Sequence, residues 1–324
     1  DVLVAMYSER DSFAVYLLKR HQINRLTLTQ YLSHGPRNKE EIQVEEEAED
    51  LEGESAHASN AGPLELYTTN LNVEAQKGKT DPLIGREKEI ERAAQILCRR
   101  RKNNPLLVGD PGVGKTSIAE GLAWLIVNGR APKPLANAEV FSLDIGALVA
   151  GTKYRGDFEK RLKQLLSALK KKPEAVLFID EIHMIIGAGS SMGSTMDASN
   201  LIKPALSNGS LRCIGSTTFQ EYRQVFEKDH ALSRRFQKID VNEPSISETI
   251  DILRGLKSKF EEFHHVEYED QALISAVELS AKFINDRFLP DKAIDVIDEA
   301  GAQRRLKAEQ DNTLITVENI EDIV

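Results

Sequence analysis

Residues 109–116, Gly-Asp-Pro-Gly-Val-Gly-Lys-Thr, have the types and spacing of a phosphate-binding loop. Glycines let successive backbone N–H groups turn toward one anion, and the start of a following helix adds a positive dipole end. Lys115 would then reach the β- and γ-phosphates of a nucleotide, and the Thr116 hydroxyl would ligate Mg²⁺. The predicted contacts with ATP are Gly109, Asp110, Pro111, Gly112, Val113, Gly114, Lys115, Thr116 and Ser117.

The stretches on either side of this loop support the prediction. Residues 105–108 are an apolar run that predicts a short buried strand, and residues 117–127 predict a helix. A strand before the glycines and a helix after the lysine is the context in which such a loop binds phosphate. A chance glycine turn followed by a lysine is therefore the weaker interpretation.

A second pair of reactive side chains follows another apolar run. Residues 176–179, Val-Leu-Phe-Ile, predict a buried strand, and Asp180 and Glu181 come directly after it. At the end of that strand Asp180 could hold Mg²⁺, and Glu181 could take a proton from an attacking water. Strands often end in solvated acids, so this assignment depends on the phosphate loop one sheet unit earlier.

Two further groups would suit hydrolysis rather than binding alone. Residues 214–218 predict a strand that ends in hydroxyls and presents Thr218 to the γ-phosphate or the water, although it could be an ordinary strand exit. Arg234 and Arg235 precede the fifth predicted strand, and arginines from a neighbouring subunit can stabilise charge in the transition state. The alternative for the two arginines is a surface pair in a charged loop.

An alternating series of strands and helices has to position these groups. Strands are predicted at 106–109, 140–144, 176–180, 211–216 and 236–241, and helices at 84–100, 117–128, 157–169 and 198–206. The alternation predicts an α/β fold with a parallel sheet covered on both faces, which binds ligands at the carboxyl edge of its strands. Helices predicted at 247–263, 271–284 and 291–306 form a second, smaller, all-helical unit.

Composition places the acidity in one segment. Residues 36–66 contain ten acidic and two basic residues, which accounts for most of the net charge of −9. The segment has few large apolar residues and is predicted to be a disordered linker, and residues 1–35 to be the helical tail of an incomplete domain. Cys98 and Cys213 lie in apolar segments and predict structural thiols in a reducing compartment. No apolar run approaches the ~18 residues of a membrane span.

Two more stretches could contact a partner. Lys153, Tyr154 and Arg155 stand between glycines and predict an exposed loop that grips a ligand, although a lone tyrosine can also be a small hydrophobic anchor. The basic run at 99–102 ends a predicted helix, where cations complement the helix dipole. Because no aromatic residues or second basic patch accompany it, we expect neither nucleic-acid binding nor, given the absence of apolar spans, membrane binding.

From residue 68 onward the chain resembles the first AAA+ module of the bacterial Clp-family unfoldases. Besides the motifs above, the resemblance rests on segments 81–86 (DPLIGR), 98–105 (CRRRKNNP), 151–160 (GTKYRGDFEK), 227–229 (EKD), 234–237 (RRFQ) and 289–295 (LPDKAID). Segment 67–72 (YTTNLN), the acidic linker and the amino-terminal tail are similar to the ClpA branch of the family.

This resemblance implies an ASCE-type AAA+ sheet of order 5-1-4-3-2 in a large subdomain over 67–243, followed by a helical lid over 244–324. Residues 1–35 would be the end of a Clp amino-terminal domain. Ile84 and Gly85, together with the helical unit near residues 290–292, would cover the adenine. Asp180, Glu181 and Thr218 would serve hydrolysis, and the Arg234–Arg235 pair would reach the neighbouring subunit's nucleotide in a homohexamer.

The same resemblance implies a mechanical function in the cytoplasm. Tyr154, flanked by Lys153 and Arg155, would be the pore-loop aromatic that moves unfolded or tagged polypeptides, with residues 187–194 as a second pore-facing loop. An adaptor protein and a ClpP-type peptidase would be partners. One departure from the family pattern is that the helical unit has no arginine in a clear second-sensor context, which puts nucleotide sensing by the lid in doubt.

Rival functions stay open at this point. A ClpB- or ClpC-like chaperone or disaggregase would share this module, although nothing here has the sustained heptads of the coiled-coil insertion that ClpB-type proteins carry. An AAA+ nucleic-acid remodeller is less favoured, because the module is close to neutral and has no basic groove. A non-hydrolysing nucleotide switch would bind ATP without turning it over.

Overall fold

Most of the described strands within residues 62–324 join one central sheet. The computed structural model describes residues 62–80, 84–152, 155–186, 199–207, 209, 211–306 and 313–324. The predicted tail at 1–35 and the linker as far as 61 lie outside the described residues. Helix α5 covers Pro63–Tyr67, so the folded region begins before residue 66, where the linker was predicted to end. A proline is well suited to the first turn of such a helix.

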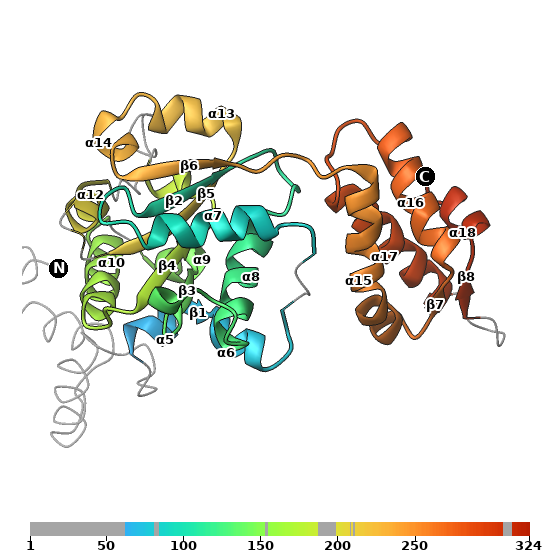
Figure 1. Ribbon diagram of the computed structural model, residues 1–324, viewed down its shortest axis with the longest axis horizontal. Coiled ribbons are helices and arrows are strands. Elements are labelled where there is room, and N and C mark those ends of the chain that lie inside the picture. Colours follow the sequence, from blue (N-terminus) through green and yellow to red (C-terminus); the bar gives the residue numbers. More distant parts are fainter. Residues whose placement is uncertain are drawn as a thin grey trace, which may run out of the picture. The chain divides into compact units, whose positions relative to one another are not determined.

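Among the described residues, six strands form the central sheet, in the order β1-β3-β4-β5-β2-β6 (Figure 1). They are β1 (Thr68–Asn70), β2 (Asn104–Val108), β3 (Glu139–Leu143), β4 (Ala175–Ile179), β5 (Arg212–Thr217) and β6 (Phe236–Asp240). Strands β2 to β6 are parallel, and their order confirms the AAA+ order. Strand β1 adds an antiparallel edge beside β3 that was not predicted, because Thr-Thr-Asn has no apolar pattern.

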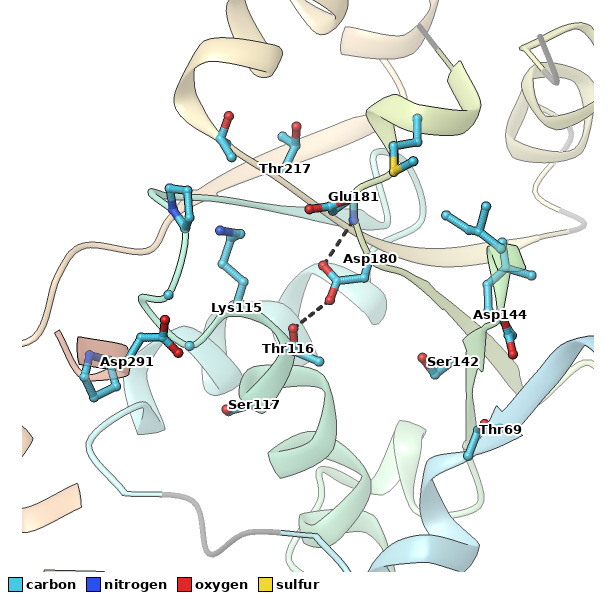
Figure 2. A pocket seen from close by; sticks show the side chains of 18 of the residues that line it. Thr69, Lys115, Thr116, Ser117, Ser142, Asp144, Asp180, Glu181, Thr217 and Asp291 are labelled. Carbon is cyan, nitrogen blue, oxygen red and sulfur yellow. Dashed lines mark hydrogen bonds between the residues drawn. The ribbon is translucent and has the colours of Figure 1, made fainter. Parts of the chain in front are cut away.

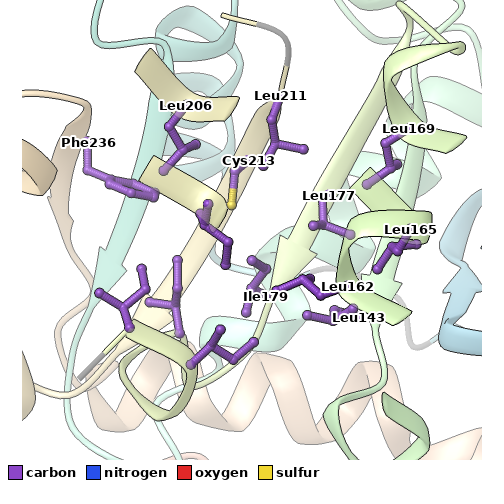
Figure 3. Close-up of a cluster of buried hydrophobic side chains, with 14 of the residues drawn as sticks. Leu143, Leu162, Leu165, Leu169, Leu177, Ile179, Leu206, Leu211, Cys213 and Phe236 are labelled. Atoms are coloured by element: carbon purple, nitrogen blue, oxygen red, sulfur yellow. The ribbon is translucent and has the colours of Figure 1, made fainter. Parts of the chain in front are cut away.

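Helices cover both faces of this sheet, and all five residues of β4 are buried. Leu177 and Ile179 belong to one core cluster together with Leu162 of helix α10 (Arg155–Lys170) (Figure 3), whereas Val176 and Phe178 belong to the other. Because successive side chains of a strand point to opposite faces, a strand buried on both faces has a continuous apolar sequence. This is why the central strands could be predicted.

The remaining elements of the large subdomain surround these clusters. They are α6 (Leu71–Gln76), α7 (Glu87–Leu97), α8 (Lys115–Val127), η1 (Lys133–Leu135), α9 (Ile145–Val149), α10 (Arg155–Lys170), α11 (His183–Ile186), α12 (Ser199–Ser207), α13 (Phe219–Glu221), η3 (Tyr222–Phe226) and α14 (His230–Ser233). Helix α7 begins later than the predicted residue 84, because Gly85 has a φ of +75°. Cys213 is buried as predicted, but Cys98, just after α7, is exposed.

The chain after β6 forms the lid. Its described helices are α15 (Ile246–His264), α16 (Asp270–Phe283), α17 (Asp291–Leu306) and α18 (Val317–Glu321). Ser245 and Glu248 start α15 with a capping box, in which each side chain bonds the other residue's backbone N–H. The lid is not purely helical, since the two-residue strands β7 (Glu267–Tyr268) and β8 (Leu314–Ile315) pair in parallel. They are too short to give an alternating pattern in the sequence.

Specific contacts connect the lid with the sheet-bearing part. The Leu289 N–H, just before α17, donates to the Glu243 carboxylate at 2.7 Å, and Glu243 lies between β6 and α15. The Lys259 ammonium of α15 donates to the Thr80 carbonyl at 2.7 Å.

Within the described part of the chain, no helix combines the length and apolarity that crossing a bilayer requires.

Candidate active site

The carboxyl ends of β2, β4 and β5 meet at one edge of the sheet, where a pocket of about 840 Å³ opens (Figure 2). These strands are neighbours and parallel, so the segments that follow them must lie together. The pocket is lined by Thr69, Pro111, Gly112, Gly114, Lys115, Thr116, Ser117, Ser142, Leu143, Asp144, Ile145, Asp180, Glu181, Met184, Thr217, Thr218, Pro290, Asp291 and Ile294. We refer to it as the central pocket.

The glycine-rich loop after β2 forms one wall of the central pocket. Gly114 has a φ of +88°, which favours glycine, and helix α8 starts at the next residue. Gly109 has no room for a side chain, because a Cβ there would lie 2.2 Å from the Val241 carbonyl oxygen. The buried Arg86 guanidinium donates to the Val113 carbonyl at 2.7 Å and to the Asn242 carbonyl at 2.8 Å, which ties the loop to the chain after β6.

Lys115 lies at the centre of this loop. Its ammonium donates to the Gly109 carbonyl at 3.0 Å and to the Asp110 carbonyl at 2.7 Å. Burial lowers the pKa of Lys115, and the charges of nearby carboxylates, chiefly Asp180, act in the opposite direction. An anion in the pocket would favour the charged ammonium. The lysine is therefore placed to exchange carbonyl partners for phosphate oxygens.

The two predicted acids stand opposite the loop. The Thr116 hydroxyl donates to the Asp180 carboxylate at 2.7 Å, and the Glu181 N–H donates to the other oxygen of the same carboxylate at 3.1 Å (Figure 2). Glu181 has a φ of +46°, an unfavourable backbone conformation for a residue with a side chain. A hydroxyl beside a carboxylate is a suitable ligand pair for Mg²⁺.

Hydroxyls at the end of β5 complete this side of the pocket. Thr218 lines the pocket as predicted, and its side-chain oxygen accepts the Glu221 N–H at 3.4 Å. Thr217 also lines the pocket and shares a hydrogen bond of 3.1 Å with Nδ1 of His183. Neither Thr217 nor His183 was predicted as a site residue, although His183 follows the two acids closely in the chain.

The lid contributes one wall of the central pocket, near the residues 290–292 that the resemblance assigned to the adenine. Among the described residues that line the pocket, the lid provides Pro290, Asp291 and Ile294, whereas Ile84 and Gly85 do not line it. Burial first, and then the negative charge of Asp295, raise the pKa of the Asp291 carboxyl. Segment 84–86 still adjoins the phosphate loop through Arg86.

Arg234 and Arg235 do not line the central pocket. Both are exposed and line a second hollow of about 620 Å³ beside the amino ends of β2 and β6. It is lined by Arg99, Arg100, Arg101, Lys102, Asn103, Asn104, Leu206, Gly209, Arg234 and Arg235, and we call it the cationic hollow. The basic run at 99–102, predicted as a helix end, thus meets the two arginines in space.

The predicted substrate loop can be placed only in part. Lys153 and Tyr154, like the stretch 187–194, lie outside the described residues, and Arg155 is the first residue of α10. The helix α9 before this loop is capped by the Asp144 carboxylate, which accepts the Ala147 N–H at 2.8 Å.

Known proteins share this architecture. Residues 105–242 match the ATPase family associated with various cellular activities (AAA), and residues 245–323 match the AAA lid domain. The ClpA homolog protein of Fuscovulum blasticum is 58% identical over 312 residues, which are 94% of this chain and 39% of the relative. Chaperone protein ClpB of Bacteroides thetaiotaomicron is 56% identical over 251 residues, which are 77% of this chain and 29% of that protein.

A solved structure gives the same result. Hsp104 of S. cerevisiae in its complex with casein, in an extended conformation, matches with a TM-score of 0.72 and 45% identity. The match covers 79% of this chain and 43% of the Hsp104 chain, so the chain spans less than half the length of these relatives. The matched regions include the central pocket and its lid wall. The chain belongs to the AAA+ ATPases and is a nucleotide-binding module of the Clp family.

Proposed function

We propose that this module binds ATP with Mg²⁺ in the central pocket and hydrolyses it. The observation that carries the proposal is the contact of Thr116 with Asp180 at 2.7 Å, in the pocket that also holds Lys115 and Glu181. The backbone N–H groups of the loop and Lys115 suit the phosphates, and Thr116 and Asp180 suit the ion. Mg²⁺ enters with the nucleotide as part of the substrate.

The base of the nucleotide needs an apolar cover. Ile84 and Gly85 were assigned this role by resemblance, and Pro290 and Ile294 of the lid line the pocket as further apolar groups. Because Arg86 joins segment 84–86 to the loop, that segment can reach a bound adenine from beside the phosphates. We assign the adenine to the space between segment 84–86 and the lid.

Glu181 is the general base in this proposal. Its carboxylate takes a proton from water while the water oxygen bonds to the γ-phosphorus. The bond from that phosphorus to the β–γ bridging oxygen breaks, and its electron pair stays on ADP. Lys115 offsets the negative charge on the phosphates. Thr218 donates its hydroxyl to the γ-phosphate or the water, since its oxygen already accepts a backbone N–H.

Arg234 and Arg235 act on the nucleotide of a second copy, in a homohexamer. The phosphate loop follows the carboxyl end of β2, and the arginines lie beside its amino end. Five strand residues at about 3.3 Å each separate the two ends, which is farther than an arginine side chain extends. A ring in which each copy faces its neighbour's pocket would bring the two half-sites together.

Glu181→Gln tests the hydrolytic part of the proposal in the full-length protein. The amide keeps the size of the side chain but cannot take a proton, so we expect ATP turnover to fall by about 10²- to 10⁴-fold while ATP binding is retained. Glu174→Gln is the matched control, since Glu174 is exposed and precedes the other end of β4. Unchanged turnover in Glu181→Gln would remove Glu181 from the mechanism.

Hydrolysis drives the unfolding and threading of polypeptides. In support, Hsp104, a structural neighbour, was solved with casein, and the relatives include proteins named as chaperones. Tyr154, between Lys153 and Arg155, grips the polypeptide in the pore of the ring. Partners are an adaptor, unfolded or tagged proteins and a ClpP-type peptidase, and the location is the cytoplasm.

A substitution at Tyr154 tests the mechanical part separately. Tyr154→Ala should leave ATP turnover within a few-fold of the parent but abolish unfolding of a tagged substrate, because the aromatic contact is lost. Tyr154→Phe keeps the ring and should retain unfolding. Unfolding by Tyr154→Ala at the parent rate would exclude the pore-loop role and leave the hydrolysis proposal intact.

The second candidate is disaggregation without a peptidase. It is favoured by the similarity to ClpB, which at 56% identity is almost as high as that to the ClpA homolog at 58%. Reactivation of an aggregated protein in the absence of peptidase supports this candidate, whereas degradation that requires a ClpP-type peptidase supports the first. A steep fall of DNA affinity with salt would point instead to a nucleic-acid remodeller, for which the cationic hollow is the candidate surface.

A further inference from the structure

Ser216 places a buried hydroxyl beside an apolar core residue on its face of the strand. It is the last residue but one of β5, is 0% exposed, and shares its face of the strand with Ile214. Ile214 packs in the core cluster that also contains Leu107, the β2 residue opposite Ser216. A buried hydroxyl destabilises a fold unless it is hydrogen-bonded, so the partners of Ser216 indicate its role.

Outside its ladder pairing with β2, Ser216 bonds to the segment that follows β4. Its hydroxyl donates to Oδ1 of Asp180, and its oxygen accepts the Glu181 N–H at 3.0 Å. Its carbonyl accepts the Ile182 N–H at 3.0 Å. One residue of β5 therefore contacts three consecutive residues, of which the first two are the acids of the central pocket.

These bonds determine how each acid is presented. Asp180 receives Ser216 on Oδ1 and the Thr116 hydroxyl on Oδ2, so the rotation of its carboxylate is fixed from both sides. Glu181 has the unfavourable φ of +46°, and its N–H is held by the Ser216 oxygen as well as by Asp180. A conformation of this kind persists only where its surroundings stabilise it.

We infer that Ser216 is a positioning residue for ATP hydrolysis. It turns Asp180 so that Oδ2 faces Thr116, and it holds the Glu181 backbone in the conformation that presents the carboxylate to the pocket. Ser216 does not line the pocket, so it acts through the two acids. The inference rests on the roles proposed above for Asp180 and Glu181.

Ser216→Ala in the full-length protein tests the inference through two readouts. We expect kcat for ATP hydrolysis to fall on the order of tenfold, because one charge-assisted bond and one backbone partner are lost. The Mg²⁺ concentration for half-maximal rate should rise several-fold, since Asp180 is no longer held toward Thr116. The ATP turnover that remains in a Lys115→Ala variant is subtracted from the rates of the parent and of Ser216→Ala. The difference then reports the central pocket and not any other nucleotide site of the full-length protein.

Ser280→Ala is the matched control. Ser280 is 0% exposed in the lid, and its hydroxyl donates to the Val277 carbonyl at 3.1 Å. It removes a buried hydroxyl at a site away from the acids, so it should lower the melting temperature without changing the Mg²⁺ dependence. If Ser216→Ala changes the melting temperature alone, with kcat and Mg²⁺ dependence within twofold of the parent, the inference is overturned.

Ser216→Cys serves if the alanine variant does not fold. The thiol is similar in size but a weaker donor, so we expect the same two changes at a smaller size, and parental values of both would overturn the inference. Glu181→Gln is measured alongside. If it hydrolyses ATP normally, the proposed function fails; if it is inactive while the Ser216 variants match the parent, only the inference fails.

Discussion

The two edges of the central sheet carry opposite kinds of chemistry. At the carboxyl edge, the central pocket brings together carboxylates, hydroxyls, backbone N–H groups and the partly buried Lys115. At the amino edge, the cationic hollow gathers Arg99, Arg100, Arg101, Lys102, Arg234 and Arg235. The same strand, β2, connects the two edges, so each chain carries both surfaces but cannot bring them into contact.

The two edges also differ in how their side chains are held. Thr116, Asp180 and Glu181 are hydrogen-bonded to one another or to β5, which gives the pocket a defined geometry. Arg234 and Arg235 have exposed side chains. Of the two, Arg235 has its backbone carbonyl held by a hydrogen bond from the buried Asn104 amide. A reaction shared between two copies requires a preformed pocket on one copy and an exposed cationic pair on the other. The following predictions test that difference.

The largest expected effect comes from the arginines. Arg234→Ala together with Arg235→Ala should lower ATP turnover by about 10³-fold or more while leaving ATP affinity within a few-fold of the parent. If the arginines act across copies, mixing this variant with Lys115→Ala should restore part of the activity, because some interfaces then pair an intact pocket with intact arginines. Steady-state hydrolysis of the mixture against each variant alone measures this.

The control for the arginines removes the same charge from the same hollow. Arg100→Ala with Arg101→Ala leaves the pair at 234–235 in place and should reduce turnover less than tenfold. If both double variants lose activity equally, net charge of the amino edge matters rather than the position of the two arginines. If mixing restores no ATP turnover, the arginines do not act on the pocket of a neighbouring copy.

A smaller effect is expected at Asn104, the buried first residue of β2 at the amino edge. Its amide donates to the Arg235 carbonyl at 3.2 Å, and its carbonyl oxygen accepts the Cys213 N–H at 2.9 Å. Asn104→Ala leaves the Cys213 N–H buried without this partner, so we expect a loss of about 1–3 kcal/mol in the free energy of unfolding. Urea denaturation of the chain measures it.

The same variant should also disturb catalysis through Arg235. We expect turnover to fall about tenfold at a temperature where the protein stays folded, since a displacement of the arginine misplaces its charge. In a background that already has Arg235→Ala, Asn104→Ala should cause little further loss. Additive losses in that double-mutant cycle would show that Asn104 supports the fold and not the arginine.

Much of the fold could be predicted because the central strands are buried on both faces. β4 is a run of apolar residues at 175–179 followed by acids, and its neighbours have similar runs. The strands that escaped prediction, β1, β7 and β8, have two or three residues each and are defined by their pairing partners. A strand that is defined only by its pairing with a distant segment leaves no pattern in the local sequence.

The site divides in the same way. Residues 109–117 and the acids at 180–181 are contiguous motifs that each follow an apolar run, so the predicted parallel sheet placed both at its carboxyl edge. Arg86 and Asp291 lie in segments that the family resemblance had marked, but Ser216 reaches the acids through contacts with a distant part of the chain, and no motif indicated its role. Ser216 carries a weak signal, a hydroxyl two residues after Ile214 on a buried strand face.

The smallest expected effect concerns the carboxylate that the lid brings to the carboxyl edge. A Cβ on Gly112 of the phosphate loop would lie 2.7 Å from the Cβ of Asp291, so the two residues are packed together. If this edge is built to receive negative phosphates, an extra negative charge there opposes them. Asp291→Asn should therefore tighten ATP binding by about 3- to 10-fold at alkaline pH. Titration with a fluorescent nucleotide analogue measures the affinity.

The pH dependence decides whether charge is the cause. Burial and the charge of Asp295 raise the pKa of Asp291, so the parent loses the opposing charge as pH falls through that raised pKa. The affinity ratio of Asp291→Asn to parent should then approach one at low pH, and protonation of the nucleotide cancels in the ratio. Asp295 lies on the same helix as Asp291, and its exposed charge is paired with Arg287, so Asp295→Asn should change affinity less. A ratio that stays constant with pH would mean that Asp291 acts through its packing against Gly112.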